Sequence, residues 1–127
     1  MTRTESPRVL VVEDENVYRA YLSRVLRARG YQVETAFDGR SALTVGSSFH
    51  PDVLIIDWML RNEYEGGQVA EMMRDVTPDL CVIVITGFCS PYLKQRAGEA
   101  GISCIVEKPF ELDQLISTVD TILGLRG

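Results

Sequence analysis

The sequence contains only three cysteines and one histidine. The cysteines, Cys81, Cys89 and Cys104, are far apart and form no C-x-x-C pair. An odd number at this spacing argues against a disulfide framework and against a zinc site. We therefore expect the cysteines to serve as small buried hydrophobic side chains.

Long apolar runs and concentrated positive charge are also missing. No run approaches the roughly 20 apolar residues of a membrane-spanning helix, and residues 1–7 lack the apolar stretch of a secretory signal. The net charge is −5 and the basic residues are scattered, which argues against nucleic-acid binding by this chain. With 127 residues there is room for one core, so we expect a single domain over 1–127, with its core at about 8–124. Because the apolar runs and the signal are missing, we expect a cytoplasmic protein with no membrane contact.

Short apolar runs alternate with helical patterns along the chain. The runs at 9–12 and 53–56 are continuously apolar, which is typical of strands covered on both faces by helices. The alternation predicts an α/β fold, doubly wound, with a parallel sheet, right-handed crossovers and helices on both faces. The expected strands are 8–13, 31–36, 52–57, 80–86 and 103–107, and the expected helices are 16–29, 39–48, 67–76, 91–99 and 111–124.

Polar residues follow or end four of these strands. Glu13 and Asp14 end the first strand, Asp57 the third and Thr86 the fourth, and Lys108 follows the fifth. Ligands of a doubly wound sheet bind outside the carboxyl ends of its strands. We therefore expect these side chains to converge on one site.

The residue types in this set indicate a particular chemistry. Neighbouring carboxylates require a compensating cation, and an all-oxygen cluster suits Mg²⁺ better than zinc or copper. Asp57, fixed at the end of an apolar strand, can act as a nucleophile toward phosphorus. The cation, Lys108 and the Thr86 hydroxyl would stabilise charge on the phosphoryl oxygens. The pattern therefore predicts an aspartyl phosphate at Asp57.

Four motifs in order carry a family resemblance that covers essentially the whole chain. They are V-L-V-V-E-D-E at 9–15, L-I-I-D-W at 54–58, V-I-T-G at 84–87 and E-K-P-F at 107–110. The chain resembles the receiver domains of response regulators, the CheY-like superfamily of two-component signalling. The resemblance implies a flavodoxin-like (βα)5 three-layer sandwich with a five-stranded parallel sheet of order 2-1-3-4-5.

The resemblance also implies roles for individual residues. Asp57 matches the phosphoacceptor, Asp14 and Glu13 match the acidic pair that binds the metal together with Asp57, and Met59 matches the residue whose backbone carbonyl joins them. The other matches are Thr86 as the switch hydroxyl, Ile105 at the position of the aromatic switch residue, and Lys108, whose peptide bond to Pro109 is typically cis.

The implied function is that of a signalling switch. The phosphoryl group would come from a phosphohistidine of a sensor histidine kinase or phosphotransfer protein, with Mg²⁺ as cofactor or Mn²⁺ as its substitute. The chain would catalyse only its own phosphorylation and slow dephosphorylation, so it is not expected to be an enzyme in the usual sense. Phosphorylation would change the surface formed by 91–99, 103–107 and 111–124, which an output partner or domain would read. We expect a monomer or a weak homodimer.

Other interpretations of these residues are weaker. Singly, Asp14 suits the first turn of a helix and Lys108 a surface, but their position at the same sheet edge as Asp57 outweighs this. A receiver fold used only for docking, without phosphorylation, would be favoured by loss of the acidic pair, Asp57 or Lys108, and none is lost. A flavodoxin-type binder needs a phosphate-cradling loop after the first strand, where the acids at 13–15 would repel phosphate. A phosphatase of the haloacid dehalogenase type needs a second aspartate where Met59 stands.

Two features depart from the family pattern. The segment 60–67 after the phosphoacceptor lacks the usual proline and is one residue longer than the usual loop. Ile105 has no aromatic ring to rotate, so the switch that this position usually carries must work differently here.

Overall fold

The computed structural model of the chain describes residues 6–60 and 64–126. Residues 61–63, part of the longer loop noted above, lie outside the described residues. Among the described helices, none combines the length and apolarity that crossing a membrane requires.

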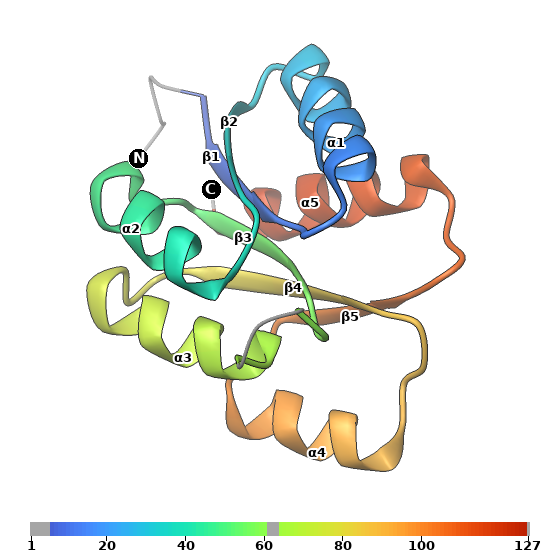
Figure 1. Cartoon of the computed structure of the whole chain (residues 1–127). Helices are drawn as coiled ribbons and strands as arrows, with labels where there is room; N and C mark the ends of the chain where they lie inside the picture. Colours follow the sequence, from blue (N-terminus) through green and yellow to red (C-terminus); the bar gives the residue numbers. More distant parts are fainter. Residues whose placement is uncertain (1–5, 61–63, 127) are drawn as a thin grey trace.

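One parallel sheet forms the centre of the molecule (Figure 1). Its strands run in the order β2-β1-β3-β4-β5, so the expected topology is confirmed. Each strand is only four to six residues long, and the continuously apolar strands β1, β3 and β4 are stable only when both of their faces are covered. The strands are β1 Arg8–Val12, β2 Gln32–Ala36, β3 Val53–Asp57, β4 Cys81–Thr86 and β5 Cys104–Glu107.

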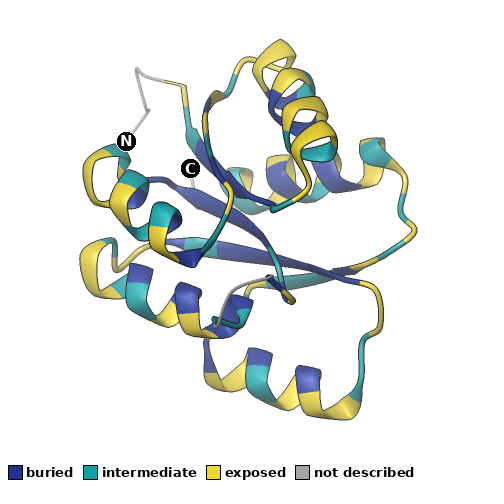
Figure 2. Ribbon diagram, viewed as in Figure 1, coloured by how far each residue is buried: buried dark blue, intermediate teal, exposed yellow. Residues whose placement is uncertain are grey.

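Helices cover both faces of the sheet. In Figure 1, α1 and α5 lie on one side, and α2, α3 and α4 lie on the other. The two core clusters match this division, because Val9 and Val11 of β1 pack with α1 and α5, whereas Leu10 and Val12 pack with α2 and α3. Figure 2 shows the central strands almost wholly buried. The helices are α1 Asn16–Ala28, α2 Gly39–Phe49, α3 Gly66–Val76, α4 Pro91–Glu99 and α5 Leu112–Arg126.

Side-chain caps fix where the helices after β1 and β4 begin. The Glu15 carboxylate accepts hydrogen bonds from the amides of Val17 and Tyr18, which satisfies free N–H groups at the start of α1. The Ser90 hydroxyl accepts from the Leu93 amide at the start of α4. Both helices therefore begin directly at the carboxyl edge of the sheet. The turn that follows β1 is short and rigidly placed as a result.

The start of α3 packs closely against the segment that follows β3. The Gly66 amide donates to the Trp58 carbonyl at 2.8 Å. A Cβ atom at Gly66 would lie 2.9 Å from the Asp57 carbonyl oxygen and 3.1 Å from the Trp58 Cα. Because backbone atoms cannot yield easily, only glycine permits this approach. This close contact fixes the start of α3 against the backbone of Asp57 and Trp58.

The structure corrects some details expected from the sequence. Strand β1 ends at Val12, so Glu13 lies beyond the strand and not at its last position. The three cysteines are half-buried at the margins of the core, where we expected full burial. They lie near the ends of strands or after them, where the covering helices leave part of each side chain accessible.

Candidate phosphoacceptor site

Asp57 lies at the carboxyl end of β3, and its side chain is 14% exposed. Its Oδ1 atom accepts a hydrogen bond from the Met59 amide at 3.1 Å. The Trp58 amide donates to the Ile85 carbonyl on β4, which ties the following residue to the sheet. The carboxylate is therefore held in one orientation, with access to solvent from one side.

Lys108 reaches Asp57 from the other side of β4. Its Nζ atom lies 2.9 Å from the Asp57 Oδ2 atom. The Lys108 amide donates to the Thr86 carbonyl at 2.7 Å, and the peptide bond to Pro109 is cis. Burial alone would lower the Lys108 pKa, but the hydrogen bond and charge of Asp57 outweigh it and raise the pKa. Lys108 is therefore a cation at neutral pH.

The acidic pair lies on the opposite side of Asp57. The Glu13 side chain is buried, and its Oε2 atom accepts a 3.3 Å hydrogen bond from the Glu15 amide. Burial raises the Glu13 pKa above its ordinary value, and the charge of Asp57 and a hydrogen bond with Asp14 raise it further. The largest cause of this rise is burial, and the charge of Asp57 adds to it. Glu15 itself caps α1, so its carboxylate serves the helix.

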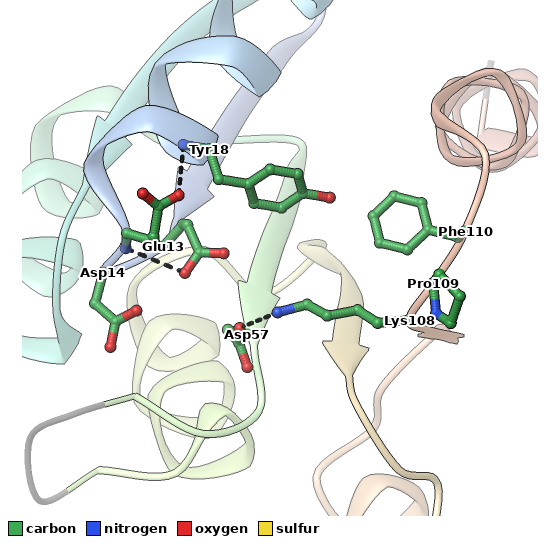
Figure 3. A pocket seen from close by; sticks show the side chains of 8 residues that line it. Glu13, Asp14, Tyr18, Asp57, Lys108, Pro109 and Phe110 are labelled. Atoms are coloured by element: carbon green, nitrogen blue, oxygen red, sulfur yellow. Dashed lines mark hydrogen bonds and ion pairs between the residues drawn. The ribbon is translucent and has the colours of Figure 1, made fainter.

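These residues line one cavity of about 580 Å³ at the carboxyl edge of the sheet. Figure 3 shows the acids on one side of Asp57 and the Lys108 side chain crossing from the other. The structure therefore brings together Glu13, Asp14, Asp57 and Lys108, as expected from the strand ends. The full lining consists of Glu13, Asp14, Glu15, Tyr18, Asp57, Lys108, Pro109 and Phe110.

The donor set suits a hard divalent cation, although the ligands are not preassembled. Within residues 6–60 and 64–126, no three Asp, Glu, His or Cys side chains already converge as metal ligands. Instead, Lys108 neutralises Asp57, and the Glu13 carboxylate is bonded to the Glu15 amide. Carboxylates that share a cavity and repel one another gain from a cation that draws them together. The residues present therefore fit Mg²⁺.

Thr86 does not line this cavity. Its side chain is buried, and its Oγ1 atom donates to the Phe88 carbonyl at 3.1 Å and accepts from the Phe88 amide at 3.3 Å. The hydroxyl is thus engaged within its own loop. Glu107 also holds this loop, because its Oε2 atom accepts from the Cys89 amide at 3.0 Å.

Ile105 and α4 lie beside that loop. Ile105 is half-buried against the core cluster that contains α2, α3 and α4. The carboxyl end of α4 is fastened by the Arg74 guanidinium, which donates to the Ala100 and Gly101 carbonyls. Such a cation at a helix carboxyl end also complements the helix dipole. The amino end of α4 directly follows the loop and is capped by the Ser90 hydroxyl.

Tyr18 and Glu107 are site residues that the sequence patterns did not single out. Tyr18 lies in the first turn of α1, where an aromatic residue has no special meaning by itself. Its place four residues after the acidic Asp14, on the face of α1 that meets the sheet edge, is the only sequence signal that would have found it. Glu107 precedes Lys108 in the E-K-P-F motif, but the motif gave it no role of its own.

Comparison with known proteins decides the family. The model of the response regulator receiver domain matches residues 9–120. The chain belongs to this family. The receiver is 35% identical over 126 residues to the transcriptional regulatory protein PrrA of Mycobacterium leprae, covering 99% of this chain and 54% of that protein. The chain spans about half the length of the curated relatives it matches.

Solved receiver structures share the fold. The chemotaxis protein CheY4 of Vibrio cholerae is 30% identical with a TM-score of 0.85, covering 91% of this receiver and 98% of that chain. A response regulator protein from Burkholderia pseudomallei is 25% identical with a TM-score of 0.80, covering 96% of this receiver and 75% of that chain. That structure contains a phosphorylated aspartic acid, a calcium ion and citrate. This chain is thus a receiver domain of two-component signalling, a signalling domain and not a classical enzyme.

The carboxylate cluster predicts weak, saturable Mg²⁺ binding that Trp58 reports, because this buried indole directly follows Asp57. Asp14→Asn should weaken the affinity by about ten- to a hundredfold, the range typical when groups that support a metal site are lost. The measurement is tryptophan fluorescence against Mg²⁺ concentration, with calorimetry alongside. Asp75→Asn, at an exposed position near the end of α3, is the matched control and should bind as wild type does. Absence of binding to wild type by both methods would contradict the site.

Proposed function

We propose that this receiver is a phosphorylation switch in which Asp57 accepts a phosphoryl group with the help of a bound divalent cation. The observation that carries the proposal is the 2.9 Å ion pair between Lys108 Nζ and Asp57 Oδ2 in a cavity shared with two further acids. A purely structural ion pair would gain nothing from additional carboxylates beside it, since they repel Asp57. Phosphoryl transfer, in contrast, requires both a nucleophile and cations at this place.

In the proposed transfer, an Asp57 carboxylate oxygen forms a bond to phosphorus while the bond from phosphorus to the donor nitrogen breaks. The donor leaves with the electron pair of that bond, and Asp57 becomes an acyl phosphate. Lys108 stays at the edge of the cavity and neutralises charge on the phosphoryl oxygens. The metal would be held by Asp14, Asp57 and the Met59 carbonyl, with Glu13 as the second member of the acidic pair. When bound, Mg²⁺ or Mn²⁺ supplies further neutralisation of phosphoryl charge. The Burkholderia neighbour, with its phosphorylated aspartate and calcium ion, supports this assignment.

The proposed partners follow from the family. The donor is a phosphohistidine of a sensor kinase or phosphotransfer protein in the cytoplasm, and residues 1–127 act as one receiver unit, as a monomer or weak homodimer. The reader of the signal is an output partner or domain that contacts α4, β5 and α5. Support comes from the family match and from relatives about twice as long as this chain.

We further propose that the switch resides in the loop after β4. A phosphoryl group on Asp57 offers oxygen acceptors to the Thr86 hydroxyl, which would then leave the Phe88 carbonyl. Leaving it would also disturb the Glu107 contact with the Cys89 amide. The aliphatic side chain of Ile105 offers little difference in contact between the unphosphorylated and phosphorylated states. A conformational equilibrium shifts only as far as the interaction free energies of its two states differ. The loop and the amino end of α4 should therefore carry the change.

Phosphorylation by acetyl phosphate with Mg²⁺ tests the acceptor. Wild type should gain one acid-stable, base-labile phosphoryl group, seen as a single mass increment, because an acyl phosphate is readily cleaved by base. Asp57→Asn should abolish it, whereas Asp75→Asn should be labelled as wild type is. Equal labelling of Asp57→Asn would refute the nucleophile. Unlabelled wild type would favour the docking module that works without phosphorylation.

Amide exchange and NMR shifts with beryllofluoride and Mg²⁺ test the switch, because beryllofluoride mimics a phosphoryl group on Asp57. Residues 86–92 and the amino end of α4 should change, while Ile105 and the end of α4 held by Arg74 should change little. Asp57→Asn serves as the control and should show no response. A large rotameric change at Ile105 with a quiet α4 would contradict the proposal.

A further inference from the structure

Part of the cavity over Asp57 is aromatic, and phosphoryl chemistry alone does not account for it. Besides the acids and Lys108, the lining includes Tyr18, Pro109 and Phe110. In Figure 3 the Tyr18 ring projects from α1 across the cavity toward Phe110. Cations and carboxylates suffice to bind a phosphoryl group and a metal, so the two rings call for a separate explanation.

The two rings are held at a fixed place relative to the nucleophile. Their centroids lie 6.5 Å apart with an interplanar angle of 64°, which is an edge-to-face pair. The Lys108 Nζ atom lies 5.9 Å from the Tyr18 ring centroid while it bonds Asp57 at 2.9 Å. The Lys108 ammonium therefore contacts both the Tyr18 ring and the carboxylate of Asp57, the proposed nucleophile.

The surroundings of the two side chains keep them in place. Tyr18 is in the first turn of α1, and its amide donates to the Glu15 carboxylate at 2.7 Å. Tyr18 and Phe110 both pack against the core cluster between α1 and α5 and are only half-buried. Burial raises the Tyr18 pKa, so its hydroxyl stays protonated at neutral pH and does not repel a phosphoryl dianion. Each ring thus has one side on the core and another on the cavity.

Ordinary core packing does not require this arrangement. An aliphatic residue at position 18 would fill the same margin of the core, without the cation contact to Lys108 and without an edge-to-face partner. A ring that lines an open cavity beside a nucleophile instead offers a flat surface to whatever occupies that cavity. In phosphoryl transfer, the occupant beyond the phosphoryl group is the leaving group of the donor, since attacking and leaving atoms are roughly in line.

We infer that Tyr18 and Phe110 form the contact site for the leaving group of the phosphodonor and favour a flat aromatic ring there. The inference rests on the proposed function of Asp57. For an imidazole donor, the bond between the Asp57 oxygen and phosphorus forms while the P–N bond breaks. The electron pair stays on the ring nitrogen, and the ring leaves as neutral imidazole because its other nitrogen already carries a proton. Edge-to-face or stacked contact with Tyr18 and Phe110 orients this ring.

The test compares two small donors that share a P–N bond, phosphoimidazole with its ring and phosphoramidate without one. Their phosphorylation rates at limiting donor concentration, followed by intact mass with Mg²⁺, give a ratio for each variant. Tyr18→Leu should lower the ratio of phosphoimidazole to phosphoramidate by about three- to tenfold, the range of one aromatic pair contact. Tyr18→Phe keeps the ring and should preserve the ratio.

Tyr21→Leu is the matched control. Tyr21 lies one turn further along α1, is 43% exposed, and has its own cation contact with Arg24 at 5.8 Å, but it does not line the cavity. Its replacement should leave the ratio unchanged. Thermal unfolding of each variant establishes that it is folded. If Tyr18→Leu does not fold, the rate ratio of Phe110→Leu tests the inference instead.

The outcomes separate the inference from the proposed function. A ratio that falls in Tyr18→Leu or Phe110→Leu but not in Tyr21→Leu supports the leaving-group site. An unchanged ratio, or an equal loss of rate with both donors, overturns it, since equal loss means that Tyr18 acts only through Lys108. Wild type that neither donor phosphorylates overturns the proposed function and the inference together.

Discussion

Repulsion among carboxylates at one edge of the sheet is the constraint on which the rest of the site depends. Glu13, Asp14 and Asp57 line a single cavity, and the Glu13 pKa rises because of burial and the nearby charge of Asp57. The Lys108 ammonium, 2.9 Å from Asp57, supplies the compensating charge from the protein itself. A site balanced in this way favours additional positive charge, and in the proposed function a metal and a phosphoryl group would change that balance together. The acids are therefore the basis of both the proposed cofactor and the proposed reaction.

The parallel sheet places the loop after β4 next to Asp57. Strand β3 pairs with β4, and β4 pairs with β5, the strand that Lys108 follows. The Thr86 hydroxyl is bonded within its own loop, and the Glu107 carboxylate accepts from the Cys89 amide. A phosphoryl acceptor at Asp57 would compete with these local bonds. Arg74 fastens the carboxyl end of α4, so the proposed response would be confined to its amino end.

The sequence was sufficient for the sheet and for much of the site, for physical reasons. Continuous apolar runs require cover on both faces, and parallel strands bring their carboxyl ends together, so the convergence of the acids and Lys108 followed from strand ends alone. Details that depend on a rotamer or on loop conformation could not follow. The bond of the Thr86 hydroxyl to the Phe88 backbone is one example. Tyr18 is another, because only its tertiary contacts with Phe110 and Lys108 distinguish it from an ordinary inward-facing helix residue.

The measurement that tests the central claim most directly is chemical identification of the phosphorylated atom. Borohydride reduces an aspartyl phosphate to homoserine, whereas free carboxylates do not react. After treatment with acetyl phosphate and Mg²⁺, reduction and peptide mapping should show homoserine at position 57 alone. Conversion at Glu13 or Asp14, or no conversion in a sample whose mass shows a phosphoryl group, would contradict the assignment of Asp57 as the acceptor.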